Sequence, residues 1–184
     1  MEKDLRMRRN ALPVLKAKET ALRIEIKKIA DELKTFQYEF NKRKNRVFDY
    51  AELWNEYPEP LSIKFVEMNF RNIAGVEIPV LKNVEFAVRD YSLFANRAWV
   101  VGATEILKDI TVLSIQMELL IRGINILNET RKKTTQKVNL YEKVQIPEYE
   151  SAIQKIKRYL DDEENLSRAT SKIVKMRRLS GEPA

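Results

Sequence analysis

The sequence predicts a mainly α-helical protein: a long antiparallel two-helix coiled coil of N- and C-terminal helices, with a small central β-hairpin domain. Three observations predict this class. Apolar residues recur at alternating steps of three and four over residues 12–54, and again over 106–173. Residues 62–88 change to β-branched and aromatic residues with a turn signal. Helix formers and charges dominate the 184 residues, of which only 4 are glycine.

The first helix is predicted from about residue 10 to residue 55. Apolar or aromatic residues hold eleven of thirteen seam positions over six heptads, a length typical of a coiled coil and not of a globular domain's helix. At 1.5 Å per residue the helix is roughly 65–70 Å long. The seam consists of Leu12, Leu15, Glu19, Leu22, Ile26, Ile29, Leu33, Phe36, Phe40, Arg43, Val47, Tyr50 and Trp54.

Both ends of this helix carry local signals. Asn10 is a suitable N-cap, and Pro13 then falls in the first turn, where a missing N–H costs little. Leu5 lies in phase with the seam, so a kinked continuation toward the terminus is an alternative. Pro58 and Pro60 are expected to end the helix.

The central segment predicts a β-hairpin. Residues 62–73 form its first strand, Ala74-Gly75 its turn and residues 76–81 its second strand, and residues 84–88 are expected to add a third short strand. Pro79 favours an edge position because it cannot donate to a ladder. An isolated hairpin is marginal in water, so we expect this one to pack on the helices.

The second helix is predicted to begin between residues 92 and 104 and to end near residue 179, before Gly181 and Pro183. Pro147 removes a backbone hydrogen bond and is expected to kink it, in agreement with a phase change of the apolar stripe at the same place. The seam comprises Ile106, Ile110, Leu113, Met117, Leu120, Ile124, Leu127, Val138 and Tyr141, then Tyr149, Ala152, Ile156, Tyr159, Leu166 and Ile173.

These segments predict four parts: residues 1–56 as the N-terminal helix, 57–98 as the hairpin domain, 99–179 as the C-terminal helix and 180–184 as a tail. Neither helix is stable alone, so each is expected to bury the seam of the other.

The register between the helices is predicted by placing the two termini flush at one tip. Ile29 then lies near Gln154, and Trp54 lies near Glu129. Residues 106–127 are expected to extend beyond the end of the first helix.

A second apolar stripe lies about 140° around the C-terminal helix from its seam. A helix that is apolar on two faces needs two burial partners. The hairpin can cover one face, and the other is a candidate docking face for another protein of an assembly; the alternative is that the hairpin and its loops cover both. This second stripe consists of Val112, Ile115, Leu119 and Ile126.

Residues 128–137 are almost wholly polar, so we predict that the coiled coil is loosely packed there. Loose packing without a role and torsional flexibility that serves the function are the two alternative interpretations.

The composition excludes most catalytic chemistry. The chain has no histidine and no cysteine, which removes zinc-thiolate sites, Ser-His and Cys-His pairs and disulfides. Its four glycines form no phosphate-binding loop. The acidic run at residues 161–164 is better explained as a solvated helix face than as a catalytic carboxylate pair. We therefore predict no catalytic residue, no cofactor and no metal site.

The net charge of +7 is distributed along both helices among acidic residues. No stacking platform or compact recognition motif for nucleic acid occurs, so solvated helix faces and an acidic protein partner explain the charge at least as well. No run approaches the roughly 20 apolar residues of a membrane span, and the N-terminus lacks the apolar core of a signal peptide. We expect a soluble protein inside the cell.

Residues 129–147 resemble the C-terminal helix signature of the D subunit of V-type (vacuolar and archaeal-type) rotary ATPases and ATP synthases. Near the N-terminus, Leu15-Lys-x-Lys-x-x-Ala-Leu22 is similar to a second pattern of that family, and Gly75-Val-Glu-Ile-Pro79 is similar to its middle segment. The matching residues of the signature are Lys133, Thr134, Thr135, Val138, Asn139, Glu142, Ile146 and Pro147.

This resemblance implies a non-catalytic rotor, the axle of the central stalk, which carries torque between the hexamer of A and B subunits and the membrane ring. The implied partners are the A and B subunits, the F subunit and the C/d-type stalk subunit, and the implied location is the cytoplasmic side of the membrane, through the complex. Both termini are then expected to form one basic tip that meets carboxylates inside the hexamer. Its cations are Lys3, Arg6, Arg8, Arg9, Lys172, Lys175, Arg177 and Arg178.

Heptads and composition alone are equally typical of a coiled-coil adaptor or tether with no motor, which is the main alternative. A basic coiled coil that binds nucleic acid is third, and an enzyme is the weakest hypothesis.

Overall fold

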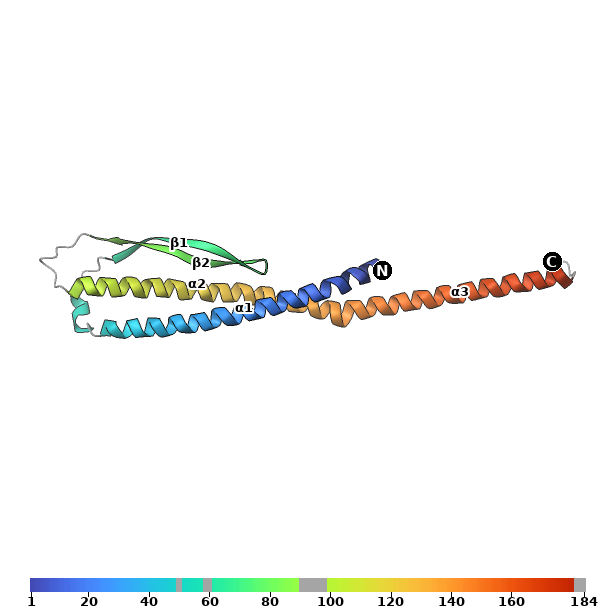
Figure 1. Cartoon of the computed structure of the whole chain (residues 1–184), viewed down its shortest axis with the longest axis horizontal. Helices are drawn as coiled ribbons and strands as arrows, with labels where there is room; N and C mark the ends of the chain where they lie inside the picture. The colour runs from blue at the N-terminus through green and yellow to red at the C-terminus, as the bar shows by residue number, and fades with distance from the viewer. Residues whose placement is uncertain (49–50, 58–60, 90–98, 181–184) are drawn as a thin grey trace. The chain divides into compact units, whose positions relative to one another are not determined.

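A computed structural model describes residues 1–48, 51–57, 61–89 and 99–180 of the chain (Figure 1). It confirms the predicted fold class: long N- and C-terminal helices with a two-stranded antiparallel hairpin between them. In chain order the elements are α1 (Glu2–Phe48), the 3₁₀ helix η1 (Ala51–Glu56), β1 (Leu61–Ile73), β2 (Val76–Val88), α2 (Trp99–Leu140), the π-helical turn η2 (Tyr141–Gln145) and α3 (Ile146–Ser180).

The chain divides into two compact units, which are described separately. Residues Lys18–Thr134 form the first, called here the core unit, and Met1–Ala17 with Thr135–Ala184 form the second, called the terminal unit. The division falls within both long helices.

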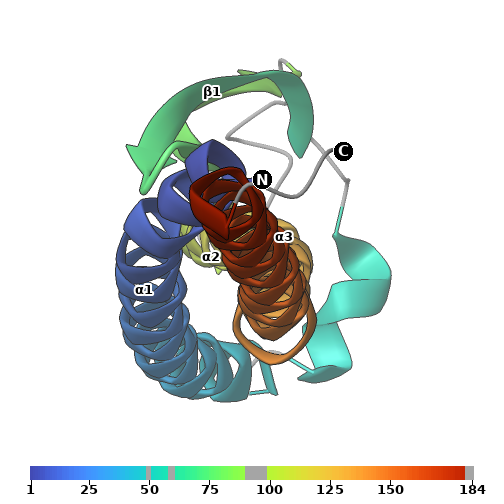
Figure 2. The ribbon, with the colours of Figure 1, turned by 90° about the vertical axis from the view of Figure 1, so that its right-hand side faces the viewer.

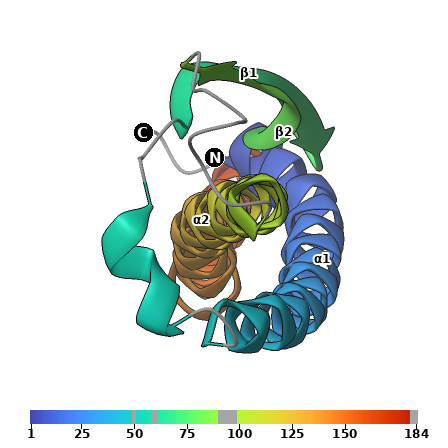
Figure 3. The same ribbon diagram turned by 90° about the vertical axis from the view of Figure 1, so that its left-hand side faces the viewer.

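The core unit contains one apolar cluster, shared by α1, the hairpin and α2. The hairpin runs along α2, and α1 lies beside the same helix (Figures 1 and 3). Full burial of one such aliphatic side chain stabilises the fold by about 1.5–3 kcal/mol, so the hairpin is held by the helices, as predicted. The buried members are Leu22, Ile29, Ile73, Ile78 and Leu127, of which Leu22 and Leu127 are 0 % exposed.

A tight turn at Ala74 and Gly75 closes the hairpin. Both residues have positive φ, 51° and 76°, as a type I′ turn requires, and the Asn72 side-chain oxygen accepts a hydrogen bond from the Gly75 N–H at 3.0 Å. The expected third strand is wrong, because β2 continues through residues 76–88. A register shift lets Glu67 face Asn83 while the next residue, Met68, faces Leu81. This bulge absorbs the break in apolar alternation that had suggested two strands.

The predicted limits of the first helix are also wrong. The helix begins at Glu2 and not at an Asn10 cap, in agreement with the alternative of a continuation toward the terminus, and it runs through Pro13. It ends at Phe48, well before Pro58 and Pro60, which lie outside the described residues. Proline removes one hydrogen bond, and contacts of the first turns with α3, described below, offset that loss.

A hydrogen bond joins η1 to the end of α1. The Trp54 indole N–H in η1 donates to the Val47 carbonyl at 2.9 Å. Trp54 therefore folds back on the last turn of α1 and does not extend the helix.

The predicted seam of the first helix is confirmed wherever it is described: each member within α1 is buried or half-buried. Tyr50 lies outside the described residues. In the second seam, burial extends from Ile106 to Ala152, whereas Ile156, Tyr159, Leu166 and Ile173 are 48–69 % exposed.

The flush register is wrong, and this explains that loss of burial. Ile29 packs with Leu127, and the rings of Trp54 and Trp99 lie 6.0 Å apart. The first turn of α1 reaches α3 only at Lys157, whose Nζ is 3.6 Å from the Glu2 carboxylate. Residues 158–180 of α3, not residues 106–127, therefore extend beyond the other helix. The reason is that η1 and the aromatic contacts pair the end of α1 with the start of α2.

The second helical segment begins at Trp99, within the predicted range; residues 90–98 of that range lie outside the described part of the chain. The kink at Pro147 stays a prediction; directly before this residue the structure has the π-helical turn η2, after which the Ile146 N–H bonds to the Tyr141 carbonyl five residues back. The predicted stop at Gly181 and Pro183 also lies outside the described residues.

By length and composition alone, the helical run Trp99–Arg178 contains one stretch apolar enough to cross a membrane, contrary to our expectation from the sequence. The core helix of a soluble protein passes the same test. Such a core helix is mostly buried, whereas 22 % of this stretch is buried.

Candidate partner-binding surfaces

The face predicted to dock a stalk partner lies on α2 within the core unit, and the hairpin covers part of it. Leu119 is only 6 % exposed, Val112 and Ile115 are half-buried, and Ile126 is 39 % exposed. The four residues of the stripe therefore differ in exposure: Leu119 lies in the interior, and Ile126 is the most exposed of them. The burial of Leu119 agrees with the alternative in which the fold itself covers this face.

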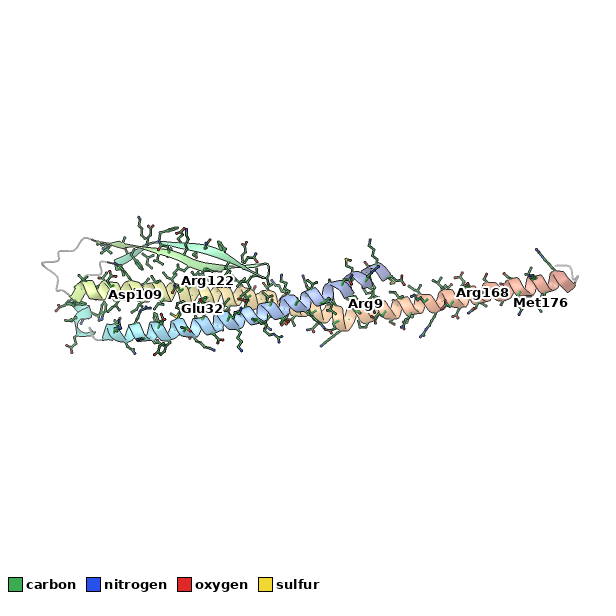
Figure 4. The ribbon with its side chains drawn as sticks, in the orientation of Figure 1. Arg9, Glu32, Asp109, Arg122, Arg168 and Met176 are labelled. Atoms are coloured by element: carbon green, nitrogen blue, oxygen red, sulfur yellow. The ribbon has the colours of Figure 1, made fainter. Side chains whose placement is uncertain are left out.

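Leu119 lines a cavity of about 100 Å³ together with residues of the hairpin. Ile78, Pro79, Val80 and Leu81 of β2 line one side of it, together with residues of α1 and α2. Glu32 and Arg71 also line it, and Figure 4 shows Glu32 on α1. Gly123 lies beside it, where a Cβ would be 3.6 Å from Ile78, so a small residue is needed for the close approach of strand and helix.

The predicted basic tip does not form as one cluster. In the terminal unit, the first turns of α1 lie beside α3 (Figure 2). Arg9 pairs with Glu150 at 2.6 Å, and the Arg8 Nε donates to the Gln145 side-chain oxygen at 2.8 Å. At 1.5 Å per residue, Arg177 lies about 40 Å further along α3 than Glu150. Figure 4 shows Arg9 beside α3, and Arg168 and Met176 further along that helix.

The predicted proximity of Lys3, Arg6, Arg8 and Arg9 to Lys172, Lys175, Arg177 and Arg178 is thus wrong. The cause is the register, which pairs the start of α1 with η2 and with the first turns of α3, up to Lys157.

The C-terminal cations remain together on the part of α3 that extends beyond α1. Every described side chain from Gln154 to Arg178 is exposed. Residues 165–178 contain Arg168, Lys172, Lys175, Arg177 and Arg178 and no acidic residue, directly after the acidic run 161–164. Arg168 was not among the predicted cations of the basic tip, although it lies in the same stretch without acidic residues.

The sequence did not predict that residues of η2 and of the first turns of α3 bind the start of α1, although Glu142 belongs to the family signature. Glu142 pairs with Lys16 at 2.6 Å, and the Tyr149 ring lies 4.6 Å from the Arg8 guanidinium carbon. Charge pattern alone could not identify these partners, because the sequence offers many opposite-charge combinations and the helix register selects among them.

The residues of the signature occupy the last turns of α2, η2 and the start of α3. Thr134 is buried, and Thr135, Val138 and Ile146 are half-buried, while Lys133, Asn139, Glu142 and Pro147 are exposed. The Thr134 hydroxyl donates to the Thr130 carbonyl at 2.8 Å. Apart from the exposed Pro147, the signature therefore combines inward threonine or apolar side chains with outward polar ones, as an amphipathic helix does.

Two carboxylates of the core unit, Glu25 and Asp31, form hydrogen bonds with neighbouring lysines. The Lys28 ammonium donates to Glu25 at 2.8 Å and lowers the pKa of that carboxyl, against the opposing effect of burial, and Arg71 at 4.0 Å lowers it further. The pKa of Asp31 is lowered by its hydrogen bond with Lys34. Within the described residues, no group of three or more acidic side chains could hold a metal ion.

Comparison with known proteins identifies the family of the chain. The family model that describes the ATP synthase D subunit matches residues 1–176. The chain is 32 % identical to the V-type ATP synthase D subunit of Borreliella burgdorferi over 175 residues, covering 94 % of this chain and 87 % of that protein. It is 28 % identical to the protein of the same name from Chlamydia abortus over 157 residues, covering 82 % and 76 %.

The chain therefore belongs to the ATP synthase D-subunit family. The match and these relatives support its assignment as a stalk subunit of the V-type ATPase class, with partners in that complex.

Proposed function

We propose that this chain is the rotor of the central stalk of a V-type ATPase or ATP synthase. In this role it transmits torque between the catalytic A/B hexamer and the ion-translocating ring and catalyses no step itself. Its partners are the A and B subunits, the F subunit and the C/d-type stalk subunit, and it lies on the cytoplasmic side of the membrane as part of the complex. The match of residues 1–176 to the D-subunit family carries the proposal.

Two surfaces have separate roles in this proposal. The basic end of α3 meets carboxylates within the hexamer, since it is exposed and has no acidic residue over residues 165–178. Charges at an exposed surface are screened and exchangeable, which suits a part that must rest at several angles. The F subunit binds the remaining exposed part of the α2 stripe, centred on Ile126.

Affinity purification of the tagged chain from its source cell, followed by mass spectrometry, tests the proposal. Recovery of the A and B subunits together with the F subunit is the expected result. If folded bait recovers none of them at low salt, the rotor function is wrong, and a coiled-coil adaptor becomes the function to pursue. Salt-sensitive binding to duplex DNA instead would favour the nucleic-acid hypothesis.

A further inference from the structure

The strongest unexplained feature is the π-helical turn η2 in the terminal unit. Each residue of an α-helix turns by about 100°, so a seam facing one partner must step by three or four. Among the apolar and aromatic residues of the seam, half-buried Tyr141 and Ile146 are five residues apart, with the polar, half-buried Gln145 between them, and half-buried Tyr149 and Ile153 follow at normal steps. The wider turn of a π-helix accommodates the extra residue, so the seam keeps facing α1.

Pro147 favours the same geometry. It has no N–H to donate to the carbonyl of Lys143, so an uninterrupted α-helix would lack a bond here. The N–H of Ile146 instead reaches the Tyr141 carbonyl. The turn is thus set by two causes that act together, the five-residue step of the seam and the proline.

The residues around this turn hold the first part of α1, called here the arm (residues 2–17). Glu142 and Gln145 belong to η2 and bind Lys16 and Arg8. Tyr149 and Glu150, one turn later, bind Arg8 and Arg9.

The described side chains of the terminal unit include none that is buried. The arm is therefore held by half-buried apolar residues and by polar contacts that are largely exposed. Exposed ion pairs are individually weak and are screened by salt.

We infer that η2 is a two-state hinge for the arm. In its π form, η2 with the first turns of α3 presents Gln145, Tyr149 and Glu150 to α1. Relaxation of the same residues to an α turn rotates the part of α3 beyond it by about 100°. The polar contacts then separate, and the arm is released. This hinge is a property of the chain itself and does not rest on the proposed rotor function.

The test measures the distance between the arm and α3 in the full-length chain. The protein has no cysteine, so Asn10→Cys and Gln154→Cys, at two exposed positions, accept nitroxide labels selectively. Pulsed electron paramagnetic resonance should give one narrow distance at low salt. A second, longer distance should grow as the salt concentration rises to about 1 M, where the Debye length falls to about 3 Å.

Three variants distinguish release of the arm by a change in η2 from release by loss of its polar contacts alone. Arg8→Gln with Arg9→Gln should increase the longer-distance population several-fold at low salt. Arg23→Gln is the matched control, because it removes an arginine from α1 whose pair with Glu19 lies in the core unit. Deletion of Val144 together with Pro147→Ala shortens the five-residue step to four, which permits an uninterrupted α-helix with the seam still in phase. This variant should keep the narrow distance at every salt concentration.

Two results overturn the hinge: a parent chain with a single narrow distance at all salt concentrations, or a deletion variant that releases the arm with the salt dependence of the parent. If the deletion variant does not fold, hydrogen exchange of the unmodified chain decides. Amides of the arm and of residues 142–147 should lose protection together as salt rises, whereas loss in the arm alone contradicts the inference.

Discussion

Gly123 of α2 lies directly against Ile78 of β2, where a Cβ at position 123 would be 3.6 Å from both Cβ and Cδ1 of that isoleucine. This distance is an ordinary van der Waals contact, so one methyl group fits at position 123 without displacing Ile78. The pair therefore sets how closely the hairpin approaches the helix.

Gly123→Ala is expected to stabilise the protein, because glycine inside a helix costs about 0.5–1 kcal/mol relative to alanine. Gly123→Leu should lower stability by about 1–3 kcal/mol, since its branches displace Ile78. Thermal unfolding followed by circular dichroism measures both. Equal destabilisation by the two substitutions would show that position 123 has no room for a methyl group.

Leu127→Ala should cost about 2–5 kcal/mol, because Leu127 is 0 % exposed at the centre of the apolar cluster. Ile24→Ala is the matched control; Ile24 is 52 % exposed on α1, and its truncation should change stability by at most about 0.5 kcal/mol. Denaturant unfolding compares the two. Similar losses for both variants would contradict the assignment of the core.

Tyr57→Phe should destabilise the junction of η1 with α2 by about 1 kcal/mol, the usual net value of a hydrogen bond. The Tyr57 hydroxyl lies 3.0 Å from Thr104 Oγ1, and its ring is 5.1 Å from that of Trp54. The only two tryptophans of the chain, Trp54 and Trp99, lie in this cluster. Their fluorescence therefore reports the effect, and an unchanged unfolding curve would exclude the bond as a stabilising contact.

Ile126→Asp is expected to weaken binding of the F subunit at least ten-fold, which corresponds to about 1.4 kcal/mol, and to leave helix content unchanged. The control is Ile121→Asp: Ile121 is 45 % exposed and lies about 140° away on the same helix. Isothermal titration calorimetry measures both affinities, and equal weakening by the two variants would show that the stripe is not the docking face. Leu119→Asp, in contrast, should unfold the core unit because Leu119 is buried.

Arg177→Glu with Arg178→Glu should weaken binding to the A/B hexamer without changing thermal stability, since both side chains are exposed on the part of α3 beyond Lys157. Arg8→Glu with Arg9→Glu should instead disturb the contacts of the arm with Gln145 and Glu150. Hexamer binding by size-exclusion chromatography distinguishes the pairs. Loss of binding only in the Arg8/Arg9 variant would reverse the assignment of the hexamer-facing end.

The sequence by itself determined the helices, the turn of the hairpin, the inward face of α1 and the irregularity near Pro147. These features depend on local periodicity and on residues such as Gly75 and Pro147, whose backbone preferences act within a few positions. It also excluded the histidine- and cysteine-dependent chemistries through missing residue types.

Only the tertiary structure decided the register of the helices. The register in turn decided that the N-terminal and C-terminal cations do not form one basic tip. A heptad seam repeats every seven residues, so sliding one helix by a heptad preserves its apolar contacts and leaves the sequence pattern equally satisfied. Contacts distant in sequence remove this ambiguity: Trp54 meets Trp99, and Ile78 packs between α1 and α2 against Gly123. Because those contacts depend on shape in three dimensions, no periodicity within either helix could have specified them.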